Sequence, residues 1–317
     1  MSRDIVFLIN NSEITAGTRG ASLGPIAVFT AARKNNKTFF AKYPIENIVE
    51  VNHLLDQTTR FQYAKRIDGL LDVYTDLNQK VSTALLQQKF PLLLAADHGS
   101  AGGTIAGIKT AYPNQRIGIV WIDAHADIHT PYTTPSGNLH GMPLATVLNE
   151  DNISCKVNDL SEETITYWNK LKEVGGISPK ALPEDVVYIA VRDTEEQENK
   201  IMERLQIKNY PVDEVRSKGV TTIINEIETK LSACDLIYVS FDVDSMDPEL
   251  TSHGTGTPVK NGLKPEEAQA ILTLLAKNKK TVCMEFVEVN PCLDEKVNTM
   301  AEVTLSLVES VVDALTK

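Results

Sequence analysis

The sequence has little of what marks secreted, membrane-spanning or nucleic-acid-binding proteins. It contains four cysteines in 317 residues, and Cys155, Cys234, Cys283 and Cys292 form no closely spaced pair. This scatter argues against a disulfide framework or a zinc knuckle, and Cys234 and Cys283 lie in apolar runs typical of core thiols. The N-terminal apolar run, DIVFLIN, is too short for a signal peptide or a membrane span. We therefore expect a cytoplasmic protein without a membrane partner.

An excess of basic residues is also missing. The net charge is −11 and the sequence pI is about 5.1. This balance argues against general nucleic-acid binding and is compatible with a cationic small-molecule substrate. There is no internal repeat, low-complexity tract or linker, and the length allows one large domain. We expect a single domain over residues 1–317.

Short apolar runs alternate along the chain with segments of helical periodicity. The predicted strands are residues 4–10, 47–51, 91–96, 118–122, 185–191, 210–212, 236–243 and 281–289. The predicted helices are residues 25–34, 61–89, 102–109, 142–149, 196–205, 220–232, 264–278 and 297–315, and residues 151–183 show no clear pattern. This alternation predicts a three-layer α/β/α fold with a mainly parallel sheet. In such sheets, ligands bind beyond the carboxyl ends of the strands.

Side chains able to bind metal follow three of these strands. The segment GIVWIDAHAD, residues 118–127, carries candidate ligands at every second position, so on a strand they would project to one side. Two further predicted strands end in Asp or His residues as well. The candidate metal ligands are His98, Asp123, His125, Asp127, Asp242 and Asp244. Burying unpaired carboxylates is costly, so this concentration indicates that cations neutralise them.

The composition of this set suits two divalent ions. Four carboxylates balance two such charges, and a pair of ions can deprotonate a bridging water. Oxygen ligands dominate and no thiolate is present, which favours two Mn²⁺ ions, while zinc, iron, cobalt and nickel stay open. Taken singly, His98 could be a turn residue, and Asp242 or Asp244 could cap a helix. Their coincidence at three strand ends favours the metal site.

These segments resemble the ureohydrolase superfamily and, within it, the arginase family. The matching pieces are Asp97-His98 with the glycine-containing loop after it, DAHAD at 123–127, SGNLHG at 136–141, SFDVDSMDP at 240–248, GTGTPV at 254–259 and EVNP at 288–291. They occur in the family's order. The resemblance implies a binuclear manganese centre on the same six ligands. It also implies hydrolysis of L-arginine to L-ornithine and urea by a metal-bridging hydroxide, the reaction of a hydrolase acting on linear amidines.

The resemblance further assigns catalytic and substrate-binding roles. His140 matches the family's proton-shuttling histidine, and an imidazole suits that task because it titrates near neutral pH. Asp127 is expected to relay a proton and to bridge both ions. Glu288 matches the glutamate that pairs with the guanidinium, a cation that prefers a bidentate carboxylate. Ser136 and Asn138 match residues that hold the substrate's α-carboxylate.

The sequence departs from the arginase pattern at two substrate-binding positions. His129 stands where arginases commonly carry an asparagine for α-carboxylate recognition. Glu195 stands where the second aspartate of an RD-x-D segment contacts the α-amino group, with Asp193 as a supporting candidate. Thr257 matches a threonine near the metal site. These differences leave the exact guanidino substrate open.

Two alternatives therefore accompany the arginase interpretation. One is another ureohydrolase, namely an agmatinase, a guanidinobutyrase or a formiminoglutamate hydrolase, which would use the same metal ligands. The other is a metal-binding protein without catalysis. Glu285 is read as structural and His253 as a surface histidine. The resemblance implies a small-molecule partner, L-arginine, and a homo-oligomer, either a trimer or a hexamer.

Overall fold

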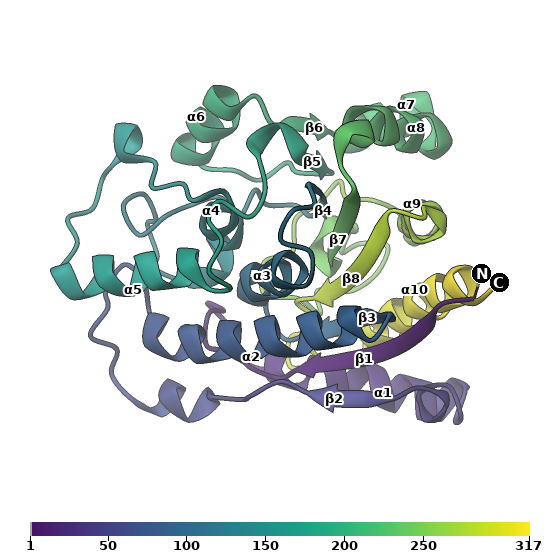
Figure 1. The fold of residues 1–317 in the computed structure, drawn as a ribbon. Helices are drawn as coiled ribbons and strands as arrows, with labels where there is room; N and C mark the ends of the chain where they lie inside the picture. Colours follow the sequence, from purple (N-terminus) through teal and green to yellow (C-terminus); the bar gives the residue numbers. More distant parts are fainter. Residues whose placement is uncertain (1) are drawn as a thin grey trace.

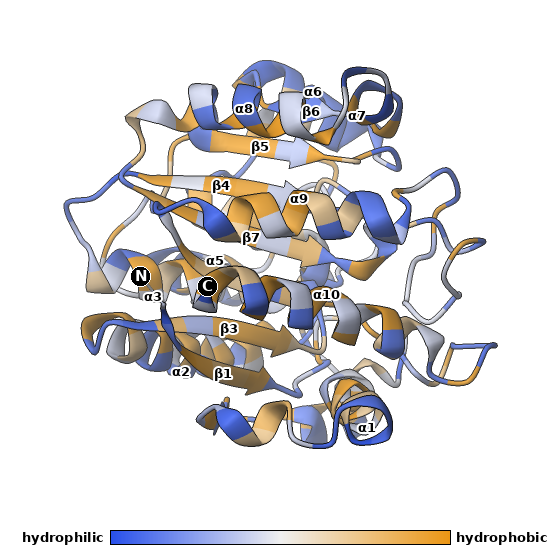
Figure 2. Ribbon diagram, turned by 90° about the vertical axis from the view of Figure 1, so that its right-hand side faces the viewer, coloured by the Kyte–Doolittle hydropathy of each residue, from blue (hydrophilic) through white to orange (hydrophobic). Residues whose placement is uncertain are grey.

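The computed structural model describes residues 2–317, which contain one eight-stranded sheet (Figure 1). The strand order is β2-β1-β3-β8-β7-β4-β5-β6, and all neighbouring strands pair in parallel. The strands are β1 (Asp4–Asn10), β2 (Ile45–Asn47), β3 (Lys89–Ala95), β4 (Ile117–Ile122), β5 (Val186–Ile189), β6 (Lys208–Tyr210), β7 (Leu236–Asp242) and β8 (Thr281–Val287). Their carboxyl ends therefore meet along one edge, and Figure 2 shows the arrowheads of several strands pointing the same way.

Helices cover both faces of this sheet. One hydrophobic cluster contains residues of α1 (Gly24–Asn35), α7 (Val212–Lys218), α8 (Val220–Lys230), α9 (Pro265–Lys277) and α10 (Thr299–Thr316). The other contains residues of α2 (Ile67–Leu86), α3 (Ala101–Ala111), α4 (Pro143–Leu148), α5 (Glu162–Glu173) and α6 (Glu196–Leu205). The two helical layers and the sheet between them confirm the predicted three-layer α/β/α class.

The strand β4 shows why continuous apolar runs form the centre of the sheet. All six of its residues are buried. Val120 and Ile122 pack into one hydrophobic cluster, whereas Ile119 and Trp121 pack into the other. Because successive side chains point to opposite faces, a strand covered on both sides must be apolar at every position. Figure 2 shows the central strands coloured mainly hydrophobic.

Several predicted boundaries were wrong. The strand predicted over 47–51 lies earlier, as β2, and the helix predicted from residue 61 begins only at Ile67. Arg66 adopts a left-handed conformation with a φ of 61°, which separates the preceding segment from the helix. The helices α5 and α7 were not predicted. For α5 a signal existed, because Ser161 accepts a hydrogen bond from the Thr164 backbone N–H as its N-cap.

The expectations about membrane spans and about the cysteines can be compared with the structure of residues 2–317. No helix in this range is long and apolar enough to cross a membrane. Cys234 and Cys283 are buried, as expected for core thiols, and all four cysteines are free.

Candidate metal centre and active site

The candidate ligands converge at the carboxyl edge of the sheet, around His98. This residue directly follows Asp97, just beyond β3, and it is 1% exposed. Its Nδ1 lies 2.9 Å from Asp123 Oδ2, 3.0 Å from Asp127 Oδ2 and 3.3 Å from Asp242 Oδ2. Separations of this size are those expected between ligand atoms that share one ion. His98, Asp123 and Asp127 form one group that could hold a metal ion.

A second such group lies alongside and shares Asp123. It consists of Asp123, His125 and Asp244. His125 Nδ1 lies 3.1 Å from Asp244 Oδ2 and 3.4 Å from Asp123 Oδ1, so the two oxygens of Asp123 face different histidines. The geometry thus points to Asp123, and not Asp127 as expected, as the residue common to both groups.

The spacing of DAHAD suggested that alternation along a strand brings the ligands to one side. The structure shows a different cause. Strand β4 ends at Ile122, so the ligands lie on the loop that follows it. Asp127 has a φ of 49°, in the left-handed region, which turns the chain back toward His98. The residues selected by the spacing therefore do lie close together, but the loop after β4 brings them together and not the alternation of a strand.

The donor set fits a metal better than it fits a network of hydrogen bonds. His98 Nδ1 is buried, has three carboxylate oxygens within 3.3 Å, and makes no hydrogen bond of good geometry. Its Nε2 lies 2.7 Å from Ser240 Oγ, and the ring stacks on Trp121 with centroids 4.0 Å apart. The neutral tautomer with hydrogen on Nε2 would leave the Nδ1 lone pair facing the carboxylates, as a metal ligand requires.

The crowding of carboxylates shifts their pKa values. Burial raises the pKa of Asp127 to about 6, and the charge of Asp123 adds to this effect. Burial, with repulsion from Asp244 and Asp123, raises the pKa of Asp242 well above its usual range. Burial also acts on Asp123, but hydrogen bonds from His125 and His98 outweigh it and lower the pKa. Buried like charges of this kind favour a cationic ligand.

His140 and Glu288 lie together beside this centre. Glu288 follows β8 with a φ of 68° and is 3% exposed. Its Oε1 accepts a hydrogen bond from the His98 backbone N–H at 3.0 Å and lies 3.3 Å from His140 Nδ1. Burial lowers the pKa of His140, but the hydrogen bond to Glu288 and the nearby negative charges outweigh it and raise the pKa to about 9.

A cavity of about 190 Å³ opens onto the ligands. Its lining includes five of the six candidate ligands together with His129, Ser136, Asn138, His140, Glu195 and Thr257. Asp123 and Glu288 lie behind this surface, in contact with lining residues. Thr257 Oγ1 donates to Asp244 Oδ2 at 3.0 Å, and Ser136 Oγ accepts from the Asn138 N–H at 3.1 Å. The structure therefore brings together all the residues predicted for the site.

The two departures from the arginase pattern lie in contact with each other in the wall of this cavity. His129 Nε2 lies 3.0 Å from Glu195 Oε2 and 3.7 Å from Glu198 Oε2. Glu195 is the N-cap of α6, and its backbone N–H donates to the Glu198 carboxylate. Asp193 lies 3.7 Å from His125 Nε2. The acidic start of α6 is therefore part of the cavity wall.

The two remaining predictions concern Glu285 and His253. Glu285 is fully buried and accepts hydrogen bonds from Ser100 at 2.7 Å and from Tyr238 at 2.6 Å, consistent with a structural role. His253 lies on the surface, with its Nδ1 3.2 Å from Glu295 Oε1. Neither residue lines the cavity above the ligands.

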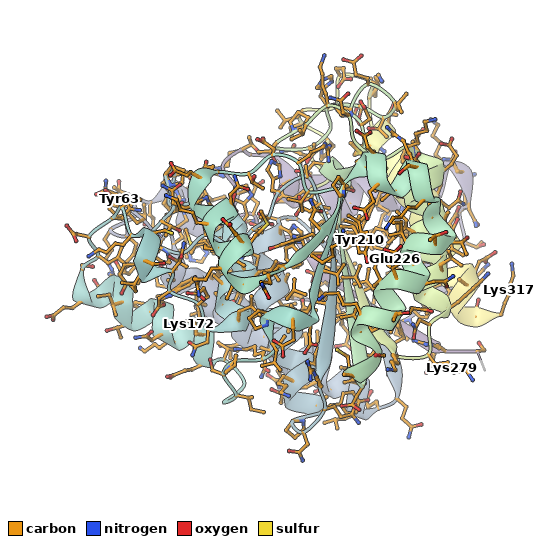
Figure 3. All side chains as sticks on the ribbon, turned by 90° about the horizontal axis from the view of Figure 1, so that it is seen from above. Tyr63, Lys172, Tyr210, Glu226, Lys279 and Lys317 are labelled. Carbon is orange, nitrogen blue, oxygen red and sulfur yellow. The ribbon has the colours of Figure 1, made fainter. Side chains whose placement is uncertain are left out.

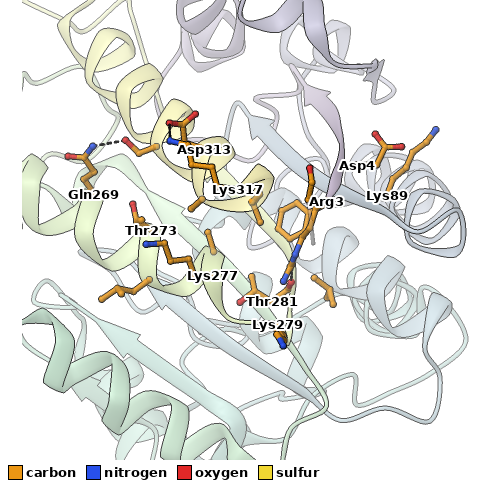
Figure 4. A pocket seen from close by; sticks show the side chains of 18 of the residues that line it. Arg3, Asp4, Lys89, Gln269, Thr273, Lys277, Lys279, Thr281, Asp313 and Lys317 are labelled. Carbon is orange, nitrogen blue, oxygen red and sulfur yellow. Dashed lines mark hydrogen bonds and ion pairs between the residues drawn. The ribbon is translucent and has the colours of Figure 1, made fainter.

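A larger cavity of about 1590 Å³ lies at the opposite, amino-terminal edge of the sheet (Figure 4). Its wall includes Asp4, Lys89 and Thr281, which are the first residues of β1, β3 and β8. Arg3 closes part of it by donating from its guanidinium to the backbone carbonyls of Thr281 and Asn278. The cavity is therefore separate from the ligand cluster at the carboxyl edge.

Sequence reasoning missed two side chains that contact the ligands. Ser240 contacts His98, and the Trp121 indole N–H donates to Asp123 Oδ2 at 3.0 Å. Each lies two positions before a candidate ligand, Ser240 before Asp242 and Trp121 before Asp123. The period of two along β7 and β4 was therefore the signal that could have found them.

Comparisons with known proteins agree with this geometry. The sequence model described as the Arginase family matches residues 3–313. The chain is 35% identical over 297 residues to the arginase of Bacillus caldovelox and 34% identical over 292 residues to that of Bacillus subtilis (strain 168), covering 92% of both chains in each case. The native structure of the Bacillus caldovelox arginase superposes with a TM-score of 0.82 and 33% identity, covering 98% of each chain. This chain belongs to the arginase family.

Proposed function

We propose that this protein is an arginase, which hydrolyses the guanidinium group of L-arginine to L-ornithine and urea. One observation carries the proposal. A single cavity brings together the two groups that could hold metal ions, the imidazole of His140, and the loop that contains Ser136 and Asn138. The family match and the named relatives support the same reaction. Neither alternative, another ureohydrolase or a metal-binding protein without catalysis, is favoured by a specific contact.

We assign the metal ligands as His98, Asp123, His125, Asp127, Asp242 and Asp244, with Asp123 shared between two ions. The oxygen-rich donor set favours Mn²⁺. Two such ions, when bound, lower the pKa of a water and so supply the nucleophile for hydrolysis. Ser240 and Trp121 would hold His98 and Asp123 in position for both ions.

The remaining residues place the substrate and move protons. Glu288 is proposed to pair with the guanidinium and to hold its carbon near the ligands, because a carboxylate matches this cation. His140 is proposed to deliver a proton to the leaving amine, with Asp127 as a relay. Ser136, Asn138 and His129 are proposed to bind the α-carboxylate, and Glu195 is proposed to bind the α-amino group. Thr257 supports Asp244 through its hydrogen bond.

The proposal extends to how the protein exists in the cell. We propose one ureohydrolase domain, because a single sheet runs through the described chain. We also propose a cytoplasmic location, as expected from the sequence, and a homotrimer or homohexamer, which rests on the family resemblance alone.

The test is urea release from L-arginine and from agmatine by the purified chain loaded with Mn²⁺. We expect arginine to be hydrolysed with the higher kcat/KM. Faster turnover of agmatine would refute the arginase assignment in favour of another ureohydrolase. Absence of hydrolysis of any guanidino compound at full metal occupancy would point to the metal-binding alternative.

A further inference from the structure

Lys65 contacts the wall of the cavity from outside, at Asn138. Its Nζ donates a hydrogen bond to Asn138 Oδ1 at 3.2 Å. Asn138 is one of the residues assigned above to the α-carboxylate. Lys65 belongs to none of the motifs described above. It lies just before α2, in a segment that was predicted to be helical and is not.

The contact is part of a docked interface and not a chance approach of a flexible side chain. The Lys65 backbone N–H donates to the Gly137 carbonyl at 2.8 Å. Gly137 has a φ of 76°, and a Cβ there would lie 2.2 Å from the Gln62 carbonyl oxygen and 3.0 Å from Tyr63 Cα. Only glycine lets the loop approach residues 62–65 so closely. Figure 3 shows Tyr63, in this segment, at the opposite end of the molecule from Lys279 and Lys317.

The hydrogen bond also sets which end of the Asn138 amide faces the cavity. Because Lys65 carries only donors, it occupies the amide oxygen and leaves the Nδ2 hydrogens for another acceptor. Gly17 lies next to Nδ2, and a Cβ at Gly17 would be only 2.8 Å from that nitrogen. The absence of a side chain at Gly17 keeps space in front of the amide. Ser136 Oγ already accepts from the Asn138 N–H, so its own hydrogen is available for a further acceptor.

The charged side chains around the cavity also favour an anionic group near Asn138. Lys65 and Arg66 are both half-buried, and burial together with the nearby charge of Arg19 lowers the pKa of Arg66. Asp193 and Glu195, on the α6 side, are among the residues that line the cavity. A protein with a net charge of −11 thus places the Lys65 ammonium next to Asn138, and carboxylates near α6. This polarity matches the carboxylate and ammonium groups of an α-amino acid.

We propose that Lys65 is a specificity-determining residue that selects guanidino substrates with an α-carboxylate. Its ammonium orients Asn138 and supplies positive charge at the carboxylate end, on the side of the site away from Glu195, which lies 3.0 Å from His129. The inference rests on the proposed function, since it deepens the substrate class of the same site. It adds a contact from a segment outside the ureohydrolase motifs.

The test compares Lys65→Met with wild type, using L-arginine and agmatine, which differ by the α-carboxylate. We expect KM for arginine to rise about tenfold, since a half-exposed charge-assisted contact contributes about 1.4 kcal/mol, while kcat changes less than twofold. The parameters for agmatine should not change. Lys65→Arg, which keeps the charge, should restore most of the affinity for arginine.

A second readout does not depend on turnover. Calorimetric binding of L-ornithine to the Mn²⁺-loaded protein should weaken about tenfold in Lys65→Met, whereas binding of putrescine, which lacks the carboxylate, should not. Lys109→Met is the matched control, because Lys109 is also half-buried and donates to a backbone carbonyl, that of Gln115, away from the cavity. It should leave both ligands unaffected.

The outcomes separate this inference from the proposed function. If wild type releases no urea from arginine, the proposed function fails whatever Lys65 does. If wild type hydrolyses arginine and Lys65→Met binds L-ornithine with unchanged affinity, the role of Lys65 is refuted. Equal losses for arginine and agmatine would also overturn it, because they would show a structural effect that does not depend on the carboxylate.

Discussion

The substitution Glu288→Gln isolates the charge that we assign to guanidinium binding. The two side chains have the same shape, and glutamine keeps an oxygen that can accept from the His98 backbone N–H, as Glu288 Oε1 does at 3.0 Å. Glu288 is 3% exposed and is not among the assigned metal ligands. The fold and the metal content should therefore survive, and only the negative charge is lost.

The magnitude follows from the burial of this carboxylate. Removing one partner of a buried ion pair costs about 3–5 kcal/mol, because the other charge is left desolvated and unpaired. We take the lower limit, since the cavity also contains other carboxylates that attract the guanidinium. A loss of about 3 kcal/mol in transition-state stabilisation corresponds to a decrease in kcat/KM of about 150-fold.

The assay is the initial rate of urea release over a range of arginine concentrations, with manganese content measured on the same samples. Glu295→Gln is the control, because Glu295 pairs with His253 on the surface, and this variant should match wild type within twofold. A Glu288→Gln protein with full metal and a kcat/KM within threefold of wild type would refute the guanidinium role. Loss of metal would refute it differently, by showing that Glu288 supports the His98 loop instead.

Three further predictions concern metal binding, proton transfer and stability. Asp123→Asn should weaken manganese binding by more than about a hundredfold at both sites, measured by metal titration, because Asp123 belongs to both ligand groups; selective loss of one ion would contradict its sharing. His140→Ala should lower kcat about 10²- to 10⁴-fold at unchanged metal content, and metal loss would contradict its role as proton donor. Lys180 lies between α5 and β5 and is 2% exposed. Burial lowers its pKa to about 8 from the ordinary 10.5, so between these pH values the unfolded chain binds more protons and the free energy of unfolding rises with pH. Unfolding of the metal-free protein by guanidinium chloride should therefore show a gain of about 3 kcal/mol from pH 8 to 10.5 that Lys180→Met lacks, and equal slopes for the two proteins would disprove it.

The sequence alone determined the fold class and the identity of the candidate metal ligands. The run IGIVWI contains only hydrophobic residues and glycine, and LIYVSFD departs from this only at Ser240 and Asp242, a pattern typical of strands covered on both faces. In a parallel sheet all carboxyl ends meet at one edge, so Asp and His residues after different strands must come close together. Both properties depend on local periodicity and on residue type, which a single sequence contains in full.

The tertiary structure decided which of these residues contact one another. The sharing of Asp123, the contact of Ser240 with His98 and the pairing of His129 with Glu195 depend on distances between segments far apart in the chain. The left-handed turn at Asp127 and the docking of Lys65 on the loop of Asn138, 73 positions away, have no local periodicity that could predict them. Such contacts are set by how loops pack on one another, and packing is a property of the whole folded chain.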